Sequence, residues 1–196
     1  MKLATRILVA AVMLLAIAGI AQADHSWNGY HWRSNNLAPT VVSKTTSALY
    51  DVPAGVSEWT TLGTPIQPSF SPGTKGKVVV SEGFSPFWYG QARIFLDSSG
   101  HITKGEVKLN TLLLEPLGAA AADHVLCQEL GHVLGLDHQR TASDSCMNDT
   151  ATIGSATSPN AHDAEQLGVI YGHTDSGGGR RSHDSGWRVV DTVMVP

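Results

Sequence analysis

Cysteine is scarce in this sequence of 196 residues, an excess of charge of either sign is missing, and long apolar runs occur only at the N-terminus. Charged residues make up 15% of the chain and the formal net charge is −4, so nothing indicates a nucleic acid as a partner. After residue 23 no apolar run could span a bilayer. There is no internal repeat, and residues 24–196 suit a single domain with its own core.

The N-terminus has the pattern of a secretory signal peptide at residues 1–23. Lys2 and Arg6 precede an apolar run over residues 7–20, and the small-residue motif Ala21-Gln22-Ala23 follows, as at a cleavage site. A membrane anchor is the alternative, but the run is shorter than the ~20 residues that a spanning helix needs. We therefore expect an exported protein, secreted or periplasmic, with no membrane attachment after cleavage.

Cys127 and Cys146 are the two cysteines, so only one intramolecular pairing exists. An exported protein meets an oxidising compartment, where thiols pair and persist as disulfides. The sequence predicts a Cys127–Cys146 disulfide, and two free buried thiols are the alternative.

The first half of the chain predicts short strands. Prolines interrupt residues 37–72, where only a short helix near residues 56–62 is expected. Residues 77–81 predict a buried strand, and residues 91–96 and 106–109 predict two strands that form a hairpin or lie side by side. His101 falls in the turn between them, where a lone histidine is expected to be solvated. A group of N-terminal rings is expected to pack into the core rather than bind a ligand: Trp27, Tyr30, His31 and Trp32.

Two helices are predicted in the second half. Asp123 is a suitable N-cap for a helix of about three turns, and Gly135 ends it by adopting a left-handed conformation. A second helix is expected from residue 160 or 161 to residue 171, with Ala164, Leu167, Val169 and Ile170 facing inward. Residues 173–186 are rich in glycine and serine and predict a flexible segment, and residues 187–196 predict an edge strand.

The stretch CQELGHVLGLDH, residues 127–138, carries the chemistry. Gln128 and His132 are four residues apart, so on a helix their side chains project side by side and can address one ion. Glu129 reaches the edge of the same cavity, where it can hold a water molecule. The chain turns at Gly135 and returns His138 as a third metal ligand.

This stretch resembles the H-E-x-x-H-x-x-G-x-x-H motif of the metzincin proteases, with Gln128 at the position of the first histidine. The sequence Ser-Cys-Met-Asn at residues 145–148 looks like their Met-turn, and HDAEQLGVIYG, residues 162–172, is similar to the closing helix of the matrixin branch. Together these motifs resemble those of secreted bacterial matrixin-like proteins. They cover residues 123–172.

The resemblance implies an α+β zincin/metzincin fold, with a twisted mixed β-sheet, an active-site helix and a C-terminal helix. It divides the chain into a signal peptide at residues 1–23, a matrixin-like catalytic domain at residues 24–173 and a tail at residues 174–196. The implied Zn²⁺ ligands are Gln128, His132 and His138, and Met147 would lie beneath the metal. The implied activity is that of a monomeric metalloendopeptidase, which hydrolyses protein or peptide substrates by metal-activated water with Glu129 as general base.

Gln128 is the departure from the pattern. Its amide oxygen lies four bonds from Cα, as does the Nε2 atom of histidine, so it can reach the position of the missing ligand. Amide oxygen is a weaker donor to zinc than imidazole, and a lower affinity is expected. His124 is no substitute, because it precedes His132 by ~12 Å along a helix; it is expected at the surface.

A second hypothesis is a catalytically weak or inactive exported protein of the same fold, acting as a binding or inhibitory module. The missing histidine supports it, as does the lack of a cysteine that could cap the metal between the signal peptide and the helix. The retained Glu129 favours the enzyme. No cluster of residues in the sequence indicates calcium or a second zinc.

Overall fold

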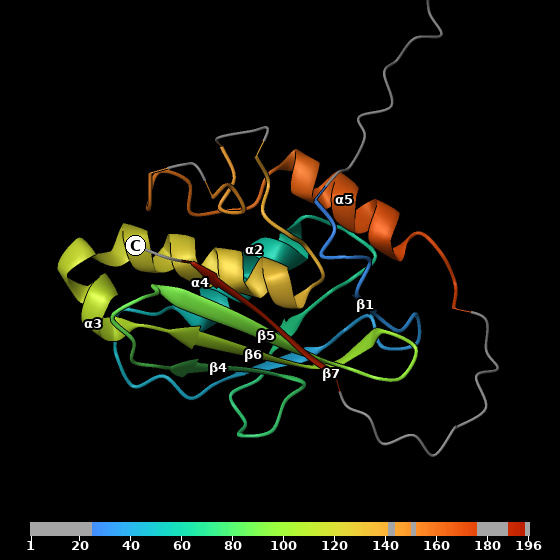
Figure 1. Cartoon of the computed structure of the whole chain (residues 1–196), viewed down its shortest axis with the longest axis horizontal. Helices are drawn as coiled ribbons and strands as arrows, with labels where there is room; N and C mark the ends of the chain where they lie inside the picture. The colour runs from blue at the N-terminus through green and yellow to red at the C-terminus, as the bar shows by residue number, and fades with distance from the viewer. Residues whose placement is uncertain (1–24, 141–143, 150–151, 176–187, 195–196) are drawn as a thin grey trace, which may run out of the picture.

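The computed structural model of the chain describes residues 25–140, 144–149, 152–175 and 188–194. The predicted signal peptide and residues 176–187 of the predicted tail therefore lie outside the described part. The fold is α+β, with one mixed sheet and helices packed on it (Figure 1). None of the helices in the described residues is long and apolar enough to cross a membrane.

Seven strands form a twisted sheet in the order β3-β2-β4-β6-β5-β7, with β1 paired to β6 outside this path. The strands β1 to β4 run parallel to their partners, whereas β5 is antiparallel to β6 and β7 is antiparallel to β5. The strand bounds are β1 His31–Trp32, β2 Thr40–Ser43, β3 Ser69–Phe70, β4 Val78–Glu82, β5 Gly90–Leu96, β6 His101–Leu109 and β7 Arg188–Met194.

The strands predicted from β-branched and alternating residues are present. The pair β5 and β6 forms an antiparallel hairpin, one of the two arrangements expected. Alternate side chains of β5 are buried, namely Ala92, Ile94 and Leu96. Because successive residues of a strand point to opposite faces, this alternation places the core on one face of the hairpin. The strand expected near the C-terminus is β7, which covers the outer edge of β5.

The helices are α2 Val52–Thr61, α3 Thr111–Leu114, the 3-10 turn η1 Glu115–Leu117, α4 Ala119–Val133 and α5 Ala161–Tyr171. The predicted start of α4 was wrong, because the helix begins four residues before Asp123 with Gly118 as its N-cap. Gly118 has φ 86°, a conformation that glycine adopts readily, and the alanines that follow are strong helix formers. The predicted end is confirmed, since Gly135 has φ 104°.

Helix α5 has the predicted bounds, and Asn160 and Asp163 form a capping box at its start. The predicted inward face was partly wrong. Leu167 and Ile170 are buried, but Val169 is 66% exposed. Polar Asp163 is fully buried instead, so the inner face of α5 is set by a hydrogen-bond network as well as by apolar packing.

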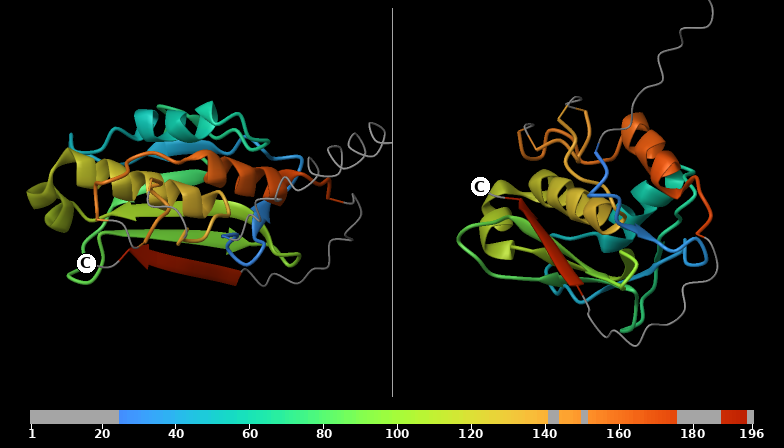
Figure 2. Two further views of the ribbon diagram at one scale, coloured as in Figure 1. Left: turned by 90° about the horizontal axis from the view of Figure 1, so that it is seen from above. Right: turned by 45° about the vertical axis from the view of Figure 1, so that its right-hand side comes forward.

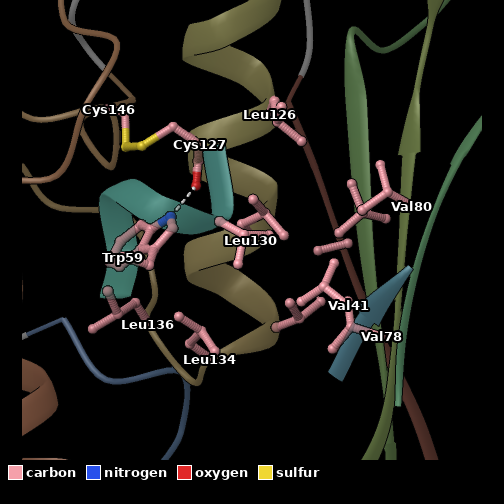
Figure 3. Packing of buried hydrophobic residues seen from close by; sticks show 14 of the residues in the cluster. Val41, Trp59, Val78, Val80, Leu126, Cys127, Leu130, Leu134, Leu136 and Cys146 are labelled. Atoms are coloured by element: carbon pink, nitrogen blue, oxygen red, sulfur yellow. Dashed lines mark hydrogen bonds between the residues drawn. A yellow bond between two sulfur atoms is a disulfide. The ribbon is translucent and has the colours of Figure 1, made fainter. Parts of the chain in front are cut away.

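The core lies between the sheet and the helices α2 and α4, which cover the same face (Figure 2). Trp59 of α2 and Leu130 of α4 pack toward Val41 and Val78 of the sheet (Figure 3). The Trp59 indole donates a hydrogen bond of 3.2 Å to the Cys127 carbonyl, which ties the two helices together. Of the four N-terminal rings expected in the core, Trp27 and Trp32 are buried, whereas Tyr30 and His31 are only partly covered.

Candidate metal centre

Helix α4 places Gln128, Glu129 and His132 inside the protein, where each is at most 1% exposed. Gln128 and His132 are separated by about one helical turn, as the sequence predicted. Buried polar side chains normally have hydrogen-bond partners. The hydrogen bonds that these three side chains make, and the polar atoms left without one, define the site.

The Gln128 side chain is oriented by its own amide group. Its Nε2 atom donates a 2.9 Å hydrogen bond to the carbonyl oxygen of Cys146. Its Oε1 atom is buried and has no hydrogen-bond partner in the part of the chain that the structure describes. The amide therefore presents an oxygen lone pair, while its nitrogen is held by the backbone.

His132 is oriented in a corresponding way. Its Nδ1 atom lies 2.9 Å from the Leu136 carbonyl, which only accepts, so Nδ1 carries the proton and Nε2 presents a lone pair. Nε2 of His132 and Nε2 of His138 are both buried without a partner among the described residues. The two rings lie edge to face with centroids 4.7 Å apart.

Both histidines are in the neutral form that binds metals. Burial, together with the nearby His138, lowers the pKa of His132 to about 3. Burial also lowers the pKa of His138, although Asp149 raises it in part. At neutral pH each Nε2 lone pair is therefore available.

Glu129 is the most unusual group in the site. Both carboxylate oxygens are fully buried and have no side-chain hydrogen-bond partner among the residues described, and the one backbone interaction, with Ala92, lowers the pKa of the carboxyl only in part. Burial raises the pKa of Glu129 well above its ordinary value. The strand β5 passes so close that a Cβ atom on Gly90 would lie 2.5 Å from Oε1 of Glu129. A buried carboxylate without side-chain partners is costly to the fold, and this is typical of functional sites.

The turn around Met147 lies against the same helix. Met147 is fully buried, and a Cβ atom on Gly131 would collide with its Sδ atom. The Met147 amide donates a hydrogen bond of 2.9 Å to Oγ of Ser145, and the Met147 carbonyl accepts one of 2.8 Å from the Gln139 amide. The turn is thus joined to the segment that carries His138.

Asp163 of α5 supports this turn from the other side. It accepts hydrogen bonds from Oγ of Ser145 at 2.6 Å and from the Asn160 amide at 2.8 Å. It also lies 3.0 Å from Nε2 of His25. The closing helix is therefore connected to the Met147 turn by a buried carboxylate.

The predicted disulfide between Cys127 and Cys146 is present (Figure 3). It joins α4 to the Met147 turn, and its two residues precede Gln128 and Met147 directly. The Cys146 carbonyl is the group that accepts the Gln128 hydrogen bond. The disulfide therefore holds together the backbone segments on both sides of the Gln128 amide.

Two expectations about histidines were wrong. His124 is fully buried and its Nδ1 atom bonds the Ala156 carbonyl at 2.5 Å, because α4 begins a turn earlier than expected and covers this position. His101 is also mostly covered, with a side chain 13% exposed.

His101 belongs to a second group of potential metal ligands, which the sequence did not reveal. The group contains His31, His101 and Asp175, and His173 contacts two of its members, His31 and Asp175. Its members come from three distant segments. The spacing His173-x-Asp175, in a region predicted to be flexible, was the one local signal.

The chemistry of the donor atoms suits a zinc ion. Gln128 Oε1, His132 Nε2 and His138 Nε2 are one oxygen and two nitrogen donors, all buried and unpartnered in the described chain. Zinc in catalytic sites takes three such ligands and keeps a fourth position open. The hydrogen bonds from Gln128 Nε2 and His132 Nδ1 to carbonyls are the kind of outer contacts that orient metal ligands.

Comparisons with known proteins found similar solved structures but no family. No protein-family model and no curated protein matches the chain. Among solved structures the chain is similar to myroilysin, with a TM-score of 0.49 and 12% identity, covering 77% of this chain and 100% of that one. It is also similar to high choriolytic enzyme 1, a hatching enzyme zinc-protease from the medaka fish Oryzias latipes, with a TM-score of 0.42 and 12% identity, covering 74% of this chain and 95% of that one.

Proposed function

We propose that this protein is a zinc metalloendopeptidase of the metzincin type, similar to the matrixin branch, with Gln128, His132 and His138 as the zinc ligands. One observation carries the proposal. Three buried donor atoms without hydrogen-bond partners accompany a buried glutamate that has no side-chain partner, in the order that the metzincin motif requires. A side chain kept only for packing has no reason to be a carboxylate at this position.

Bound to these ligands, zinc would supply Lewis-acid chemistry, which lowers the pKa of a water molecule and stabilises negative charge on the scissile carbonyl oxygen. Glu129 is the proton carrier. Its raised pKa lets a carboxylate oxygen take a proton from the attacking water and deliver it to the leaving amine. Gly90 leaves room for that carboxylate beside β5.

Gln128 makes this a weaker zinc site than one with three histidines, and its surroundings offset part of the loss. The amide is preset by the hydrogen bond to the Cys146 carbonyl, and the Cys127–Cys146 disulfide holds that carbonyl in place. A ligand that is already oriented loses less conformational entropy when the metal binds.

The substrates of this enzyme are proteins or peptides outside the cytoplasm. The disulfide supports an oxidising compartment, in agreement with secretion or export to a periplasm.

The proposal is tested with Glu129→Gln, which preserves the shape of the side chain and removes the base. We expect the variant to bind as much zinc as the wild type and to cleave an unfolded protein substrate about 10²- to 10⁴-fold more slowly. Equal cleavage by the two proteins would refute the enzyme. Val125→Ala, one turn earlier in α4, is a control for general damage to the helix.

The alternative function is a non-catalytic binding or inhibitory module. It is favoured by Gln128, whose bond to Cys146 could be purely structural. This alternative predicts that the wild type takes up no zinc at the Gln128 site and cleaves nothing, with Gln128→His restoring metal binding but not the bond to Cys146.

A further inference from the structure

A second set of donor atoms converges at the end of the sheet where β1 meets the start of β6. Oδ1 of Asp175 lies 3.3 Å from Nε2 of His31, 3.1 Å from Nε2 of His101 and 3.3 Å from Nε2 of His173. The Nε2 atoms of His31 and His173 are 3.2 Å apart. None of these residues belongs to the Gln128 site.

One contact in this arrangement lacks a hydrogen atom to share. Nδ1 of His31 lies 2.8 Å from the Gly29 carbonyl, which can only accept, so Nδ1 carries the proton. With that tautomer, Nε2 of His31 presents a lone pair to Oδ1 of Asp175 at 3.3 Å. Two lone pairs facing each other repel, and a cation between them removes the repulsion.

Asp175 is positioned for the same role. Its Oδ2 atom accepts a 2.7 Å hydrogen bond from the Ser34 amide, and the Asp175 amide donates to Oγ of Ser34 at 3.2 Å. These contacts occupy one carboxylate oxygen and aim the other at the histidines. The other ring nitrogen of His101 faces a second carboxylate, because Oδ1 of Asp97 lies 3.5 Å from Nδ1 of His101.

The spacing of the donors matches a four-coordinate zinc site. With zinc–ligand bonds of 2.0–2.1 Å, ligand atoms at the corners of a tetrahedron are ~3.3–3.4 Å apart. Four of the six distances between these donor atoms lie between 3.1 and 3.3 Å, and the donor atoms of His31, His101 and Asp175 all lie within 4.8 Å of one another. Three imidazoles and one carboxylate are also a donor set that zinc accepts.

We propose that His31, His101, His173 and Asp175 form a second, structural zinc site. Four protein ligands leave no open position, so this zinc supports the fold and does not react. It joins β1, the β5–β6 hairpin and the segment that follows α5. That segment was expected to be flexible from its sequence, and the ion supplies the contacts that hold its first residues.

The test is the zinc content per chain of the protein without its signal peptide, measured by mass spectrometry after dialysis. His173→Ala is the main variant, because this side chain is 48% exposed and its removal spares the core. We expect His173→Ala and Asp175→Asn each to bind one zinc fewer than the wild type. His162→Ala, at a histidine outside the four-residue group, should bind the same amount as the wild type.

Zinc content that is unchanged in both His173→Ala and Asp175→Asn would overturn the proposal. So would a loss in His162→Ala alone, because it would assign the ion to the group of His25, His162 and Asp163.

A variant with both His132→Ala and His138→Ala separates this site from the proposed active site. It should retain one zinc and lose it when His173→Ala is added, whether or not the wild type is a protease. If the double variant does not fold, Co²⁺ replaces Zn²⁺ in the wild type and in His173→Ala. The visible spectrum of wild type should then contain a four-coordinate component that His173→Ala lacks, and identical spectra would refute the second site.

Discussion

Gly131→Ala tests how closely the Met147 turn is packed against α4. Alanine normally stabilises the middle of a helix by about 0.5–1 kcal/mol relative to glycine. Here the added Cβ would lie 2.7 Å from the Trp59 ring, and closer still to Sδ of Met147. Trp59 and Met147 are at most 1% exposed, so neither can move aside into solvent.

The expected magnitude is the difference between these two effects. Overpacking a core by one methyl group typically costs about 1–3 kcal/mol. After the gain in helix propensity, Gly131→Ala should be destabilised by about 0–2.5 kcal/mol, with a central value of about 1 kcal/mol. For a protein of this size a loss of about 1 kcal/mol lowers the melting temperature by roughly 2–4 °C.

Gly168→Ala is the matched control, because it is also a helical glycine but has no atom within 4 Å of the added Cβ. This variant should gain about 0.5–1 kcal/mol from propensity alone. Both are compared with the wild type by thermal unfolding followed by near-ultraviolet circular dichroism, with a chelator present so that zinc does not contribute. If Gly131→Ala were as stable as Gly168→Ala, the contact of α4 with Met147 and Trp59 would be refuted.

Three more predictions concern single side chains. Gln128→His should raise the affinity for zinc by about tenfold or more, since even contacts outside the ligand shell alter metal affinity by about 10–100-fold. Isothermal titration calorimetry measures the affinity, and an unchanged value would show that residue 128 does not face the metal. Asp163→Asn should destabilise the protein by about 2–4 kcal/mol in urea unfolding, because both carboxylate oxygens accept hydrogen bonds, Oδ2 from Ser145 and Asn160 and Oδ1 from Gln139, and an amide has one acceptor oxygen. An effect no larger than that of a surface substitution would contradict the network. Burial raises the pKa of Asp97, but the hydrogen bonds from Arg33 and from backbone amides outweigh burial, and the pKa is lowered overall. The stability that these hydrogen bonds contribute is therefore present above the ordinary aspartate pKa and is lost as the pH falls through the lowered pKa. The difference in urea midpoint between wild type and Arg33→Met should therefore shrink in acid, and a difference independent of pH would exclude the ion pair as its cause.

Local features of the chain were predicted best. The end of α4 at Gly135 and the bounds of α5 follow from glycine conformation, capping and periodicity, all of which depend on neighbouring residues. The start of α4 was misplaced because Asp123 is a good N-cap by itself, whereas the alanines before it extend the helix back to Gly118. Val169 was misplaced because apolar residues were assumed to face inward, and the inner face of α5 is partly polar.

The proposed active site was accessible to prediction because most of it is local. Gln128, Glu129 and His132 belong to one helix, and His138 follows the turn after it. Helical geometry therefore indicates which side chains can meet. The orientation of each donor was not accessible, because it depends on the carbonyls of Cys146 and Leu136.

The sequence alone determined the helix that carries Gln128 and His132, the turn that returns His138 and the one disulfide that two cysteines allow, since each depends on short-range geometry or on simple counting. Only the tertiary structure brought His31, His101 and Asp175 together, across as many as 144 residues of chain. That meeting depends on the register of β1 against β6 and on where the chain emerges from α5. No local pattern specifies these, because they are properties of the packed sheet as a whole.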